Sequence, residues 1–561
     1  MRLHPDGQLY VGDLVSLEII PPEWAEVQGK KVSVRLGDAA SQPLGETSFG
    51  RYGIGGRQQA TLLWVWDASG LEAGEHELVF TVQPDGQTWR ESVRLLSREQ
   101  VPPPEPQARW EMAQTGCCQV NYISGTSVER DLPDLLAMVD AQAKDASQKL
   151  GVQIDKPLSI TFLPRVLGHG GFASGELAVS YLDRNYAGGV AATILHHEMV
   201  HELDARLGGE FRPTLLLEGL AVYLSGGHFK PEPLMPRAAA LLSPSAQCEQ
   251  ASSLKGHFRL RQSACGLNWY LPLRPLIDDF YTSQHEIGYL EAGALVEFMV
   301  KTWGWQAFSD FYRDIHPPEA SPETGEDGSQ SSAMDAALQD HFGISLDELE
   351  ERYLAALRQE RLTTELVEDV RLTVGYYDTM RRYQQVLDPS AYFLTAWLPD
   401  AASMREKGIV ADYLRRPSQP ENLAIEAMLV AADADLRAGD YIQSEELLVA
   451  VHMALSGIQR GDARPFDSYP LAADYLSVVQ AVQAAGYQPE KIEIDENIAR
   501  VQASTDGQDL IDLSLTRGLD GWKIAVELSG CIDLCRRGFA PPAQVCIIPY
   551  SRGMSTGSPA H

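Results

Sequence analysis

A proline-rich segment, Val101-Pro102-Pro103-Pro104-Glu105-Pro106, most strongly constrains how this chain of 561 residues folds. A segment of this composition forms a stiff, extended linker. Short alternating apolar runs precede it, whereas mixed helical and strand patterns follow it. Because domains usually contain ~100–200 residues, the length predicts roughly three to five of them. We therefore expect a multidomain protein with a linker over residues 99–108.

Residues 1–98 predict an all-β domain. Alternating runs at 14–19, 31–36, 60–66 and 76–82 are separated by turn clusters such as Pro84-Asp85-Gly86. This spacing is typical of a two-sheet sandwich. The phrase at 67–76, Asp-Ala-Ser-Gly-Leu-Glu-Ala-Gly-Glu-His, resembles a loop of bacterial immunoglobulin-like modules, which implies an immunoglobulin-like sandwich.

The rest of the chain predicts a central α+β domain and a mostly helical C-terminal region. In the central domain, helices are expected from about Val190 to Leu207, from Thr214 to Leu224 and from Gly288 to Trp303. Gly208-Gly209 ends the first of these helices, and Ser225-Gly226-Gly227 ends the second. The expected divisions are 109–358 for the α+β domain, 359–488 for a helical domain that includes one helical hairpin at 431–448, 489–530 for a small antiparallel sheet, and 531–561 for a tail.

Net charge narrows the classes of partner. The formal net charge is −31 at pH 7. Nucleic acids and anionic membrane surfaces both require basic patches, so neither is an expected partner. No apolar run reaches the ~18–20 residues of a transmembrane helix. Among the seven cysteines, Cys248 and Cys265 can pair, as can two of Cys531, Cys535 and Cys546, or all can remain buried thiols.

One pentapeptide carries chemistry: His197-Glu198-Met199-Val200-His201, inside the first of the expected helices. A separation of four residues places both imidazoles on one helix face, where they can share one tetrahedral cation. Glu198 can then reach water activated by that cation without binding the cation itself. This arrangement is typical of zinc hydrolases. The preceding residues, 188–195, are largely apolar, so the histidines are expected to face the protein interior.

A catalytic zinc ion needs a third protein ligand. Glu218 is the first candidate, because it lies in an otherwise apolar helix where an unpaired carboxylate is costly. Asp204, three residues after His201, is the competing ligand; its other expected roles are to orient a histidine ring or to face water.

His197-Glu198-x-x-His201 followed by Leu217-Glu218-Gly219-Leu220-Ala221-Val222-Tyr223 resembles the gluzincin metallopeptidases, in particular the peptidase MA-like group. The resemblance continues through 271–273 and 289–304 and covers residues 109–355. It implies zinc held by His197, His201 and Glu218, with Glu198 as general base. It also implies an oxyanion donor at Tyr289, with His285 as the alternative.

The related aminopeptidases carry a Gly-x-Met-Glu-Asn element whose glutamate captures the free amine of the substrate. Here Gly171-Phe172-Ala173-Ser174-Gly175 occupies that place, so the acidic anchor is missing unless Glu176 replaces it. The resemblance thus implies internal cleavage. A strand from Glu176 to Leu182 is expected to pair with the substrate backbone, through Leu177, Ala178 and Val179.

The expected function is a zinc-dependent metallopeptidase, an endopeptidase with one zinc ion per chain, acting on a peptide or protein substrate. The alternative is a catalytically inert, peptidase-like binding or adhesion protein. A serine hydrolase is rejected, because the sequence has no Gly-x-Ser-x-Gly elbow. Immunoglobulin-like modules beside a peptidase suggest an extracytoplasmic protein whose leader is absent from this sequence; the alternative is a cytoplasmic protein.

Overall fold

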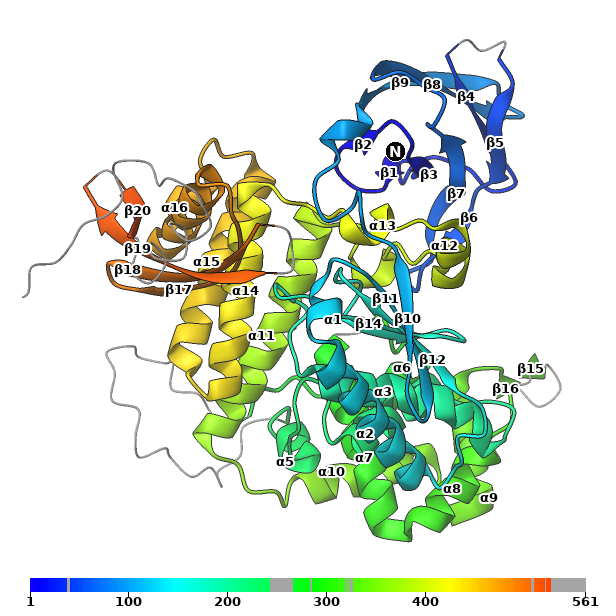
Figure 1. Cartoon of the computed structure of the whole chain (residues 1–561). Helices are drawn as coiled ribbons and strands as arrows, with labels where there is room; N and C mark the ends of the chain where they lie inside the picture. The colour runs from blue at the N-terminus through cyan, green and yellow to red at the C-terminus, as the bar shows by residue number, and fades with distance from the viewer. Residues whose placement is uncertain are drawn as a thin grey trace, which may run out of the picture.

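The computed structural model describes residues 1–37, 41–242, 266–282, 285–317, 320–321, 326–505, 509–519 and 521–525. An all-β part at the N-terminus stands above a central sheet with helices, and a helical C-terminal region with its own antiparallel sheet lies beside them (Figure 1). The multidomain organisation, the N-terminal β structure and the helical C-terminal region are confirmed. The predicted tail at 531–561 and the cysteines Cys248, Cys265, Cys531, Cys535 and Cys546 lie outside the described residues; Cys117 and Cys118, which are adjacent, form a disulfide.

The N-terminal part consists of two sheets that enclose one apolar core. One sheet has the order β1-β3-β7-β6, and the other β2-β9-β8-β4-β5. Val15, Trp66 and Phe80 are among the core residues, each with at most 1% of its surface exposed. The strands are β1 Arg2–His4, β2 Leu9–Tyr10, β3 Leu14–Ile19, β4 Lys31–Leu36, β5 Pro43–Ser48, β6 Gly50–Tyr52, β7 Arg57–Asp67, β8 Gly74–Gln83 and β9 Gln87–Leu96, with a short 3-10 helix at Arg98–Gln100.

The central sheet has five strands in the order β10-β11-β12-β14-β13. β11, β12 and β14 are parallel, and both outer strands run antiparallel to their neighbours. The strands are β10 Trp110–Gln114, β11 Cys118–Ile123, β12 Leu158–Leu163, β13 Gly171–Ala173 and β14 Leu177–Ser180. Helices α2 (Leu132–Leu150) and α3 (Ala191–Asp204) share an apolar core with one face of this sheet.

The expectation that Leu177, Ala178 and Val179 pair with a substrate strand is wrong. These residues form β14, which pairs with β12 on one side and with β13 on the other, and all three are buried. The reason is local: Gly175 has a φ of +70°, and Ser174 N donates to Glu176 O at 3.1 Å, so the chain folds back tightly before β14. Among the described residues, the terminal strand at this end of the sheet is therefore β13, and β10 is at the other end.

Helices α4 (Thr214–Ser225) and α7 (His285–Trp303) pack closely against each other beneath α3. Two glycines permit this approach. A Cβ on Gly219 would lie 2.5 Å from Ala292 O, and a Cβ on Gly293 would lie 2.5 Å from Val222 Cγ1. The close packing brings side chains of α4 and α7 to the same place as those of α3. The other central elements are α1 Ser127–Arg130, α5 Leu234–Ala239, α6 Leu273–Asp278, α8 Trp305–Arg313, α9 Gln330–Phe342, α10 Leu346–Leu357, a 3-10 helix at Ala205–Leu207, β15 Ala320–Ser321 and β16 Glu326–Asp327.

The C-terminal region contains a long helix, a helical hairpin and a four-stranded sheet. The hairpin turns at Gly439, whose φ of +80° ends the first of its helices, as the sequence predicts. The sheet, in the order β17-β18-β19-β20, packs on α14 and α16. The elements are α11 Thr364–Leu387, a 3-10 helix at Phe393–Thr395, α12 Ala401–Lys407, α13 Ala411–Leu414, α14 Pro420–Ala438, α15 Tyr441–Arg460, a 3-10 helix at Pro465–Ser468, α16 Pro470–Ala484, β17 Gln488–Asp495, β18 Ile498–Ser504, β19 Leu510–Gly518 and β20 Gly521–Ala525.

Two segments assigned by sequence to a separate helical domain belong also to the central part. α11 contributes Val370 to the core of the central domain and Met380 to the core of the C-terminal region. α12 and α13 lie between the sandwich and the central sheet (Figure 1). There Met404 and Tyr413 pack with Ala178, on the face of the sheet opposite α2 and α3. The division at residue 358 therefore does not separate two independent cores.

Buried ion pairs join the N-terminal part to the rest. The Arg165 guanidinium, 1% exposed, pairs with Asp6 and lies 3.5 Å from Asp388. Arg415 bonds both carboxylate oxygens of Asp13, at 2.6 and 2.9 Å, and pairs with Glu105 of the proline-rich linker. The linker is thus fixed to the body of the protein. Among the described helices, none is both long and apolar enough to span a bilayer.

Candidate metal centre

Helix α3 presents His197 and His201 on one face. The rings are one helical turn apart, with centroids 4.6 Å apart, and their Nε2 atoms lie 2.9 Å from each other. Each Nδ1 is buried with no hydrogen-bond partner among the described residues. The only ring nitrogen of each histidine that meets other polar groups is therefore Nε2.

Glu218 completes a group of three donor atoms. It comes from α4, and its Oε2 lies 3.2 Å from Nε2 of both His197 and His201. All three residues are largely buried, and the group meets a geometric criterion for holding a metal ion. Ligand atoms around a tetrahedral zinc ion with bonds of about 2.1 Å are separated by roughly 3.4 Å. Two imidazoles and one carboxylate at these distances fit such an ion, and the sequence predicted these three residues.

The pKa values of these three side chains depend on one another. Burial raises the pKa of Glu218, but the two histidines outweigh that effect and hold it well below its usual range. Burial lowers the pKa of His201, but Glu218 outweighs it and raises the pKa to about 9. Burial lowers the pKa of His197 to about 4. The negative charge of Glu218 and a positive charge on His201 therefore stabilise each other.

Tyr281 holds the carboxylate of Glu218 from the other side. Its hydroxyl donates to Oε1 at 2.5 Å, so the two oxygens of Glu218 serve different partners. Burial, followed by the charge of Glu218, raises the pKa of Tyr289 well above its usual range. Burial, followed by the charge of Glu218, likewise raises the pKa of Tyr281, so both phenols are protonated at neutral pH.

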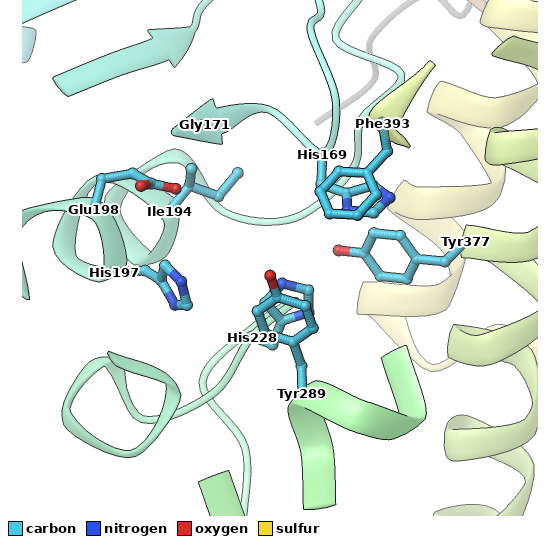
Figure 2. Close-up of a pocket in the computed structure, with 9 residues that line it drawn as sticks. All are labelled: His169, Gly171, Ile194, His197, Glu198, His228, Tyr289, Tyr377 and Phe393. Atoms are coloured by element: carbon cyan, nitrogen blue, oxygen red, sulfur yellow. The ribbon is translucent and has the colours of Figure 1, made fainter. Parts of the chain in front are cut away.

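Glu198 lies in a pocket beside the three donors. The pocket contains about 420 Å³, including space open to solvent, and is lined by His169, Gly171, Ile194, His197, Glu198, His228, Tyr289, Tyr377 and Phe393 (Figure 2). Within the part of the chain that the structure describes, no hydrogen bond or ion pair holds the Glu198 carboxylate, although it is only 7% exposed. Burial raises its pKa to about 7. A buried carboxyl with this pKa can both accept and release a proton near neutrality.

The edge strand β13 passes directly over Glu198. A Cβ on Gly171 would lie 2.8 Å from Glu198 Oε1 and 2.9 Å from Ile194 Cγ2. Glycine at this position therefore allows the strand and helix α3 to approach closely. An extended peptide that adds to β13 would be placed beside Glu198.

His228 is a pocket residue that the sequence did not suggest. It follows the Gly226-Gly227 pair that ends α4, and its Nδ1 lies 2.7 Å from Glu286 Oε2. Its ring stacks on Tyr289 with centroids 4.2 Å apart. Burial lowers the pKa of His228, but Glu286 outweighs it and raises the pKa above the usual value.

The other residues that the sequence predicts for the site are Tyr289, His285, Asp204 and Glu176. Tyr289 lies in the pocket, with its ring centroid 6.0 Å from that of His197. His285 begins α7, and its side chain lies outside the described residues. Asp204 is not a member of the donor group; it faces Arg212 at 3.7 Å, and no hydrogen bond joins it to either imidazole in the described structure. Glu176 cannot replace a missing amine anchor, because Arg405 binds both its oxygens at 2.7 and 2.8 Å.

No protein-family model matches the chain, and neither the curated proteins nor the solved structures contain a significant match to it. Function is therefore inferred from the residues of the site itself.

Proposed function

We propose that this protein is a zinc-dependent metallopeptidase of the gluzincin type that cleaves peptide bonds within a chain. The observation that carries the proposal is the convergence of His197, His201 and Glu218 on one point, with the buried carboxylate of Glu198 beside it. This combination supports a hydrolase because it provides a place for a cation and a separate group that transfers protons.

His197, His201 and Glu218 would hold the zinc ion. Bound zinc supplies Lewis acidity, which polarises a carbonyl and lowers the pKa of water to about 7. Tyr281 fixes the orientation of Glu218 through its 2.5 Å hydrogen bond. The protein thus supplies both the ligands and the group that orients one of them.

Glu198 acts as the general base and then as the general acid. Its carboxylate accepts the proton of the attacking water, and the same proton is later delivered to the amine that leaves. Since no other described group holds this carboxylate by a hydrogen bond or ion pair, its oxygens are available for that transfer.

Tyr289 and His228 are the candidate donors to the negative charge that develops on the carbonyl oxygen. Both line the pocket, and both belong to a stacked pair. Glu286 accepts from Nδ1 of His228 and raises the pKa of the ring, and the imidazolium form presents a second N–H at Nε2. Donors that are fixed in advance stabilise such charge at little cost of reorganisation.

The residues at the β13 edge of the pocket favour cleavage within a chain over removal of an N-terminal residue. Residues 171–175 before the turn contain no acidic side chain, and Glu176 is bound by Arg405. Residues 171–176 therefore offer no unpaired carboxylate to the positive N-terminus of a substrate. Strand addition at β13, rather than at β14, is the mode of backbone binding that we propose.

We also propose that the N-terminal sandwich is immunoglobulin-like. The order β1-β3-β7-β6 corresponds to the ABED sheet of that fold, and β9-β8-β4 to its GFC strands. This correspondence supports the assignment made from the loop at 67–76.

Metal analysis combined with hydrolysis of an unfolded protein tests the proposal. We expect about one zinc ion per chain and activity that a chelator abolishes. Glu198→Gln should retain zinc and lose activity by at least ~10²-fold. Glu202→Gln, one turn further along α3, is the matched control and should remain active.

A protein that binds no zinc after reconstitution, or a fully active Glu198→Gln variant, would overturn the enzyme assignment. A protein that holds zinc but cleaves nothing in a proteome-derived peptide mixture would instead support the inert binding protein.

A further inference from the structure

One wall of the pocket is built by residues far from the metal helix in sequence. Figure 2 shows Glu198, Ile194 and His197 on one side and the rings of His169, Tyr377 and Phe393 on the other. The Phe393 ring stacks on His169 with centroids 4.3 Å apart, and Tyr377 meets His169 edge-on at 5.5 Å. Together these three rings, here called the aromatic wall, give the pocket an aromatic side opposite His197.

Phe393 lies in a loop of residues 390–397, here called the arch, whose two ends lie close together. Trp397 N donates to Ser390 O at 2.7 Å and closes the arch. Gly168 N donates to Ala391 O at 2.9 Å and joins the arch to the loop that carries His169. The position of Phe393 thus depends on how the arch is held.

The N-terminal sandwich clamps this arch through the turn between β6 and β7. Gly55 N donates to Leu394 O at 2.8 Å, and the Tyr52 hydroxyl donates to Ala396 O at 3.0 Å. A Cβ on Gly53, whose φ is +69°, would lie 2.4 Å from Leu394 O. The glycine-rich turn at residues 53–56 therefore fits against the backbone of the arch next to Phe393.

The positive charge of Arg381 beside the aromatic wall favours neutral side chains over cationic ones. The guanidinium of Arg381 lies 5.5 Å from the centroid of the Phe393 ring, where it brings a positive charge to the edge of the pocket. A lysine or arginine side chain entering the same space would meet this positive charge. A neutral ring can stack against the wall without that repulsion.

We propose that the aromatic wall is a substrate subsite for a neutral aromatic side chain, with Phe393 as its specificity-determining residue and the N-terminal sandwich as the part that positions it. This rests on the proposed peptidase function, because it describes a substrate side chain held beside Glu198. The sandwich is then a component of the substrate site, although it contributes no side chain to the pocket lining.

The proposal is tested by cleavage and by binding with matched peptides that differ at one position: Phe, Leu, Lys or Ala. The wild type should cleave the Phe peptide with a kcat/KM at least roughly tenfold above that of the Ala peptide, and the Lys peptide should be the poorest. Phe393→Ala should abolish this preference, so that kcat/KM for the Phe peptide falls to that for the Ala peptide.

Gly53→Ala tests the positioning role of the sandwich. It should raise KM for the Phe peptide while kcat, zinc content and cleavage of the Ala peptide change little, because its effect reaches the site only through Leu394 and Phe393. Ile54→Ala, on the same turn with 47% of its surface exposed, is the matched control and should keep the preference.

Binding to Glu198→Gln by fluorescence anisotropy separates this inference from the function itself. Tighter binding of the Phe peptide, lost on adding Phe393→Ala, supports the subsite even if no hydrolysis is found. Equal binding of the Phe and Ala peptides overturns it, whatever the wild type hydrolyses. Hydrolysis without a preference that depends on Phe393 overturns the subsite and leaves the peptidase assignment intact.

Discussion

Tyr281 donates a 2.5 Å hydrogen bond to Oε1 of Glu218, while Oε2 of the same carboxylate lies 3.2 Å from each imidazole. The tyrosine comes from the segment between α6 and α7, so a third part of the central domain orients the ligand from α4 toward those from α3. The geometry of the donor group is therefore a property of the tertiary structure and not of one helix.

Tyr281→Phe should weaken zinc binding roughly 10- to 100-fold, because partners that orient a ligand typically contribute this much to metal affinity. Competition with a chromogenic chelator measures the effect. Tyr270→Phe removes a comparable phenol–carboxylate bond, to Glu350 at 2.8 Å, away from the site and serves as the control. Equal zinc affinity in the wild type and Tyr281→Phe would contradict the orienting role.

Gly171→Val should reduce kcat/KM by about 100-fold or more while zinc remains bound. The added Cβ meets Glu198 Oε1 and Ile194, so either β13 or the carboxylate must move, and a displacement of about 1 Å at a reacting group can cost this much. Steady-state kinetics and metal content are the measurements. Gly116→Ala, where a Cβ has only Asp140 Oδ1 near it at 3.9 Å, should be neutral. An active Gly171→Val enzyme would show that the close approach is unnecessary.

Arg165→Met should destabilise the protein by about 3–5 kcal/mol, since it leaves Asp6 and Asp388 buried without their shared counterion. Urea unfolding measures the change. Arg460→Met breaks an exposed pair with Asp462 and should cost only ~0–1 kcal/mol. A similar loss in both variants would mean that the junction with the sandwich does not depend on this buried charge.

Glu291→Gln tests a buried carboxyl outside the metal centre. Burial raises the pKa of Glu291 well above its usual value, and the nearby Leu271 amide only partly opposes this. Between the unfolded and folded pKa values the folded state binds more protons, so wild-type stability falls as pH rises above about 4.5. The glutamine variant lacks this loss.

The stability advantage of Glu291→Gln should therefore grow by about 1.4 kcal/mol per pH unit above that point, until the carboxyl ionises in the folded protein. Urea unfolding of both proteins across this pH range measures it. Parallel stability curves would show that Glu291 titrates normally.

The sequence pattern within two helices was sufficient to predict the three residues of the donor group. His197, Glu198 and His201 are related by the period of one helix, and Glu218 is conspicuous because every neighbour in its helix is apolar or small. Helix positions in this part of the chain were also predictable, since glycines end α4 and follow α3.

The other features of the site depend on contacts between distant parts of the chain, which no local sequence pattern encodes. Alternation indicates which face of a strand is buried, but not that β13 pairs beside β14, so the substrate edge was misplaced. His228 has no signal beyond its place after a helix end. Phe393 lies 195 residues after Glu198 and reaches the pocket only because the sandwich and the loop at His169 hold its arch.

The packing of α12 and α13 on the central sheet has a consequence for synthesis. Met404, Ile409 and Tyr413, which cover one face of the central sheet, are synthesised long after His197, His201 and Glu218. Until they leave the ribosome, the growing polypeptide exposes apolar surface on that face, and such surface promotes aggregation. A shortened polypeptide that stops at residue 358 should therefore aggregate.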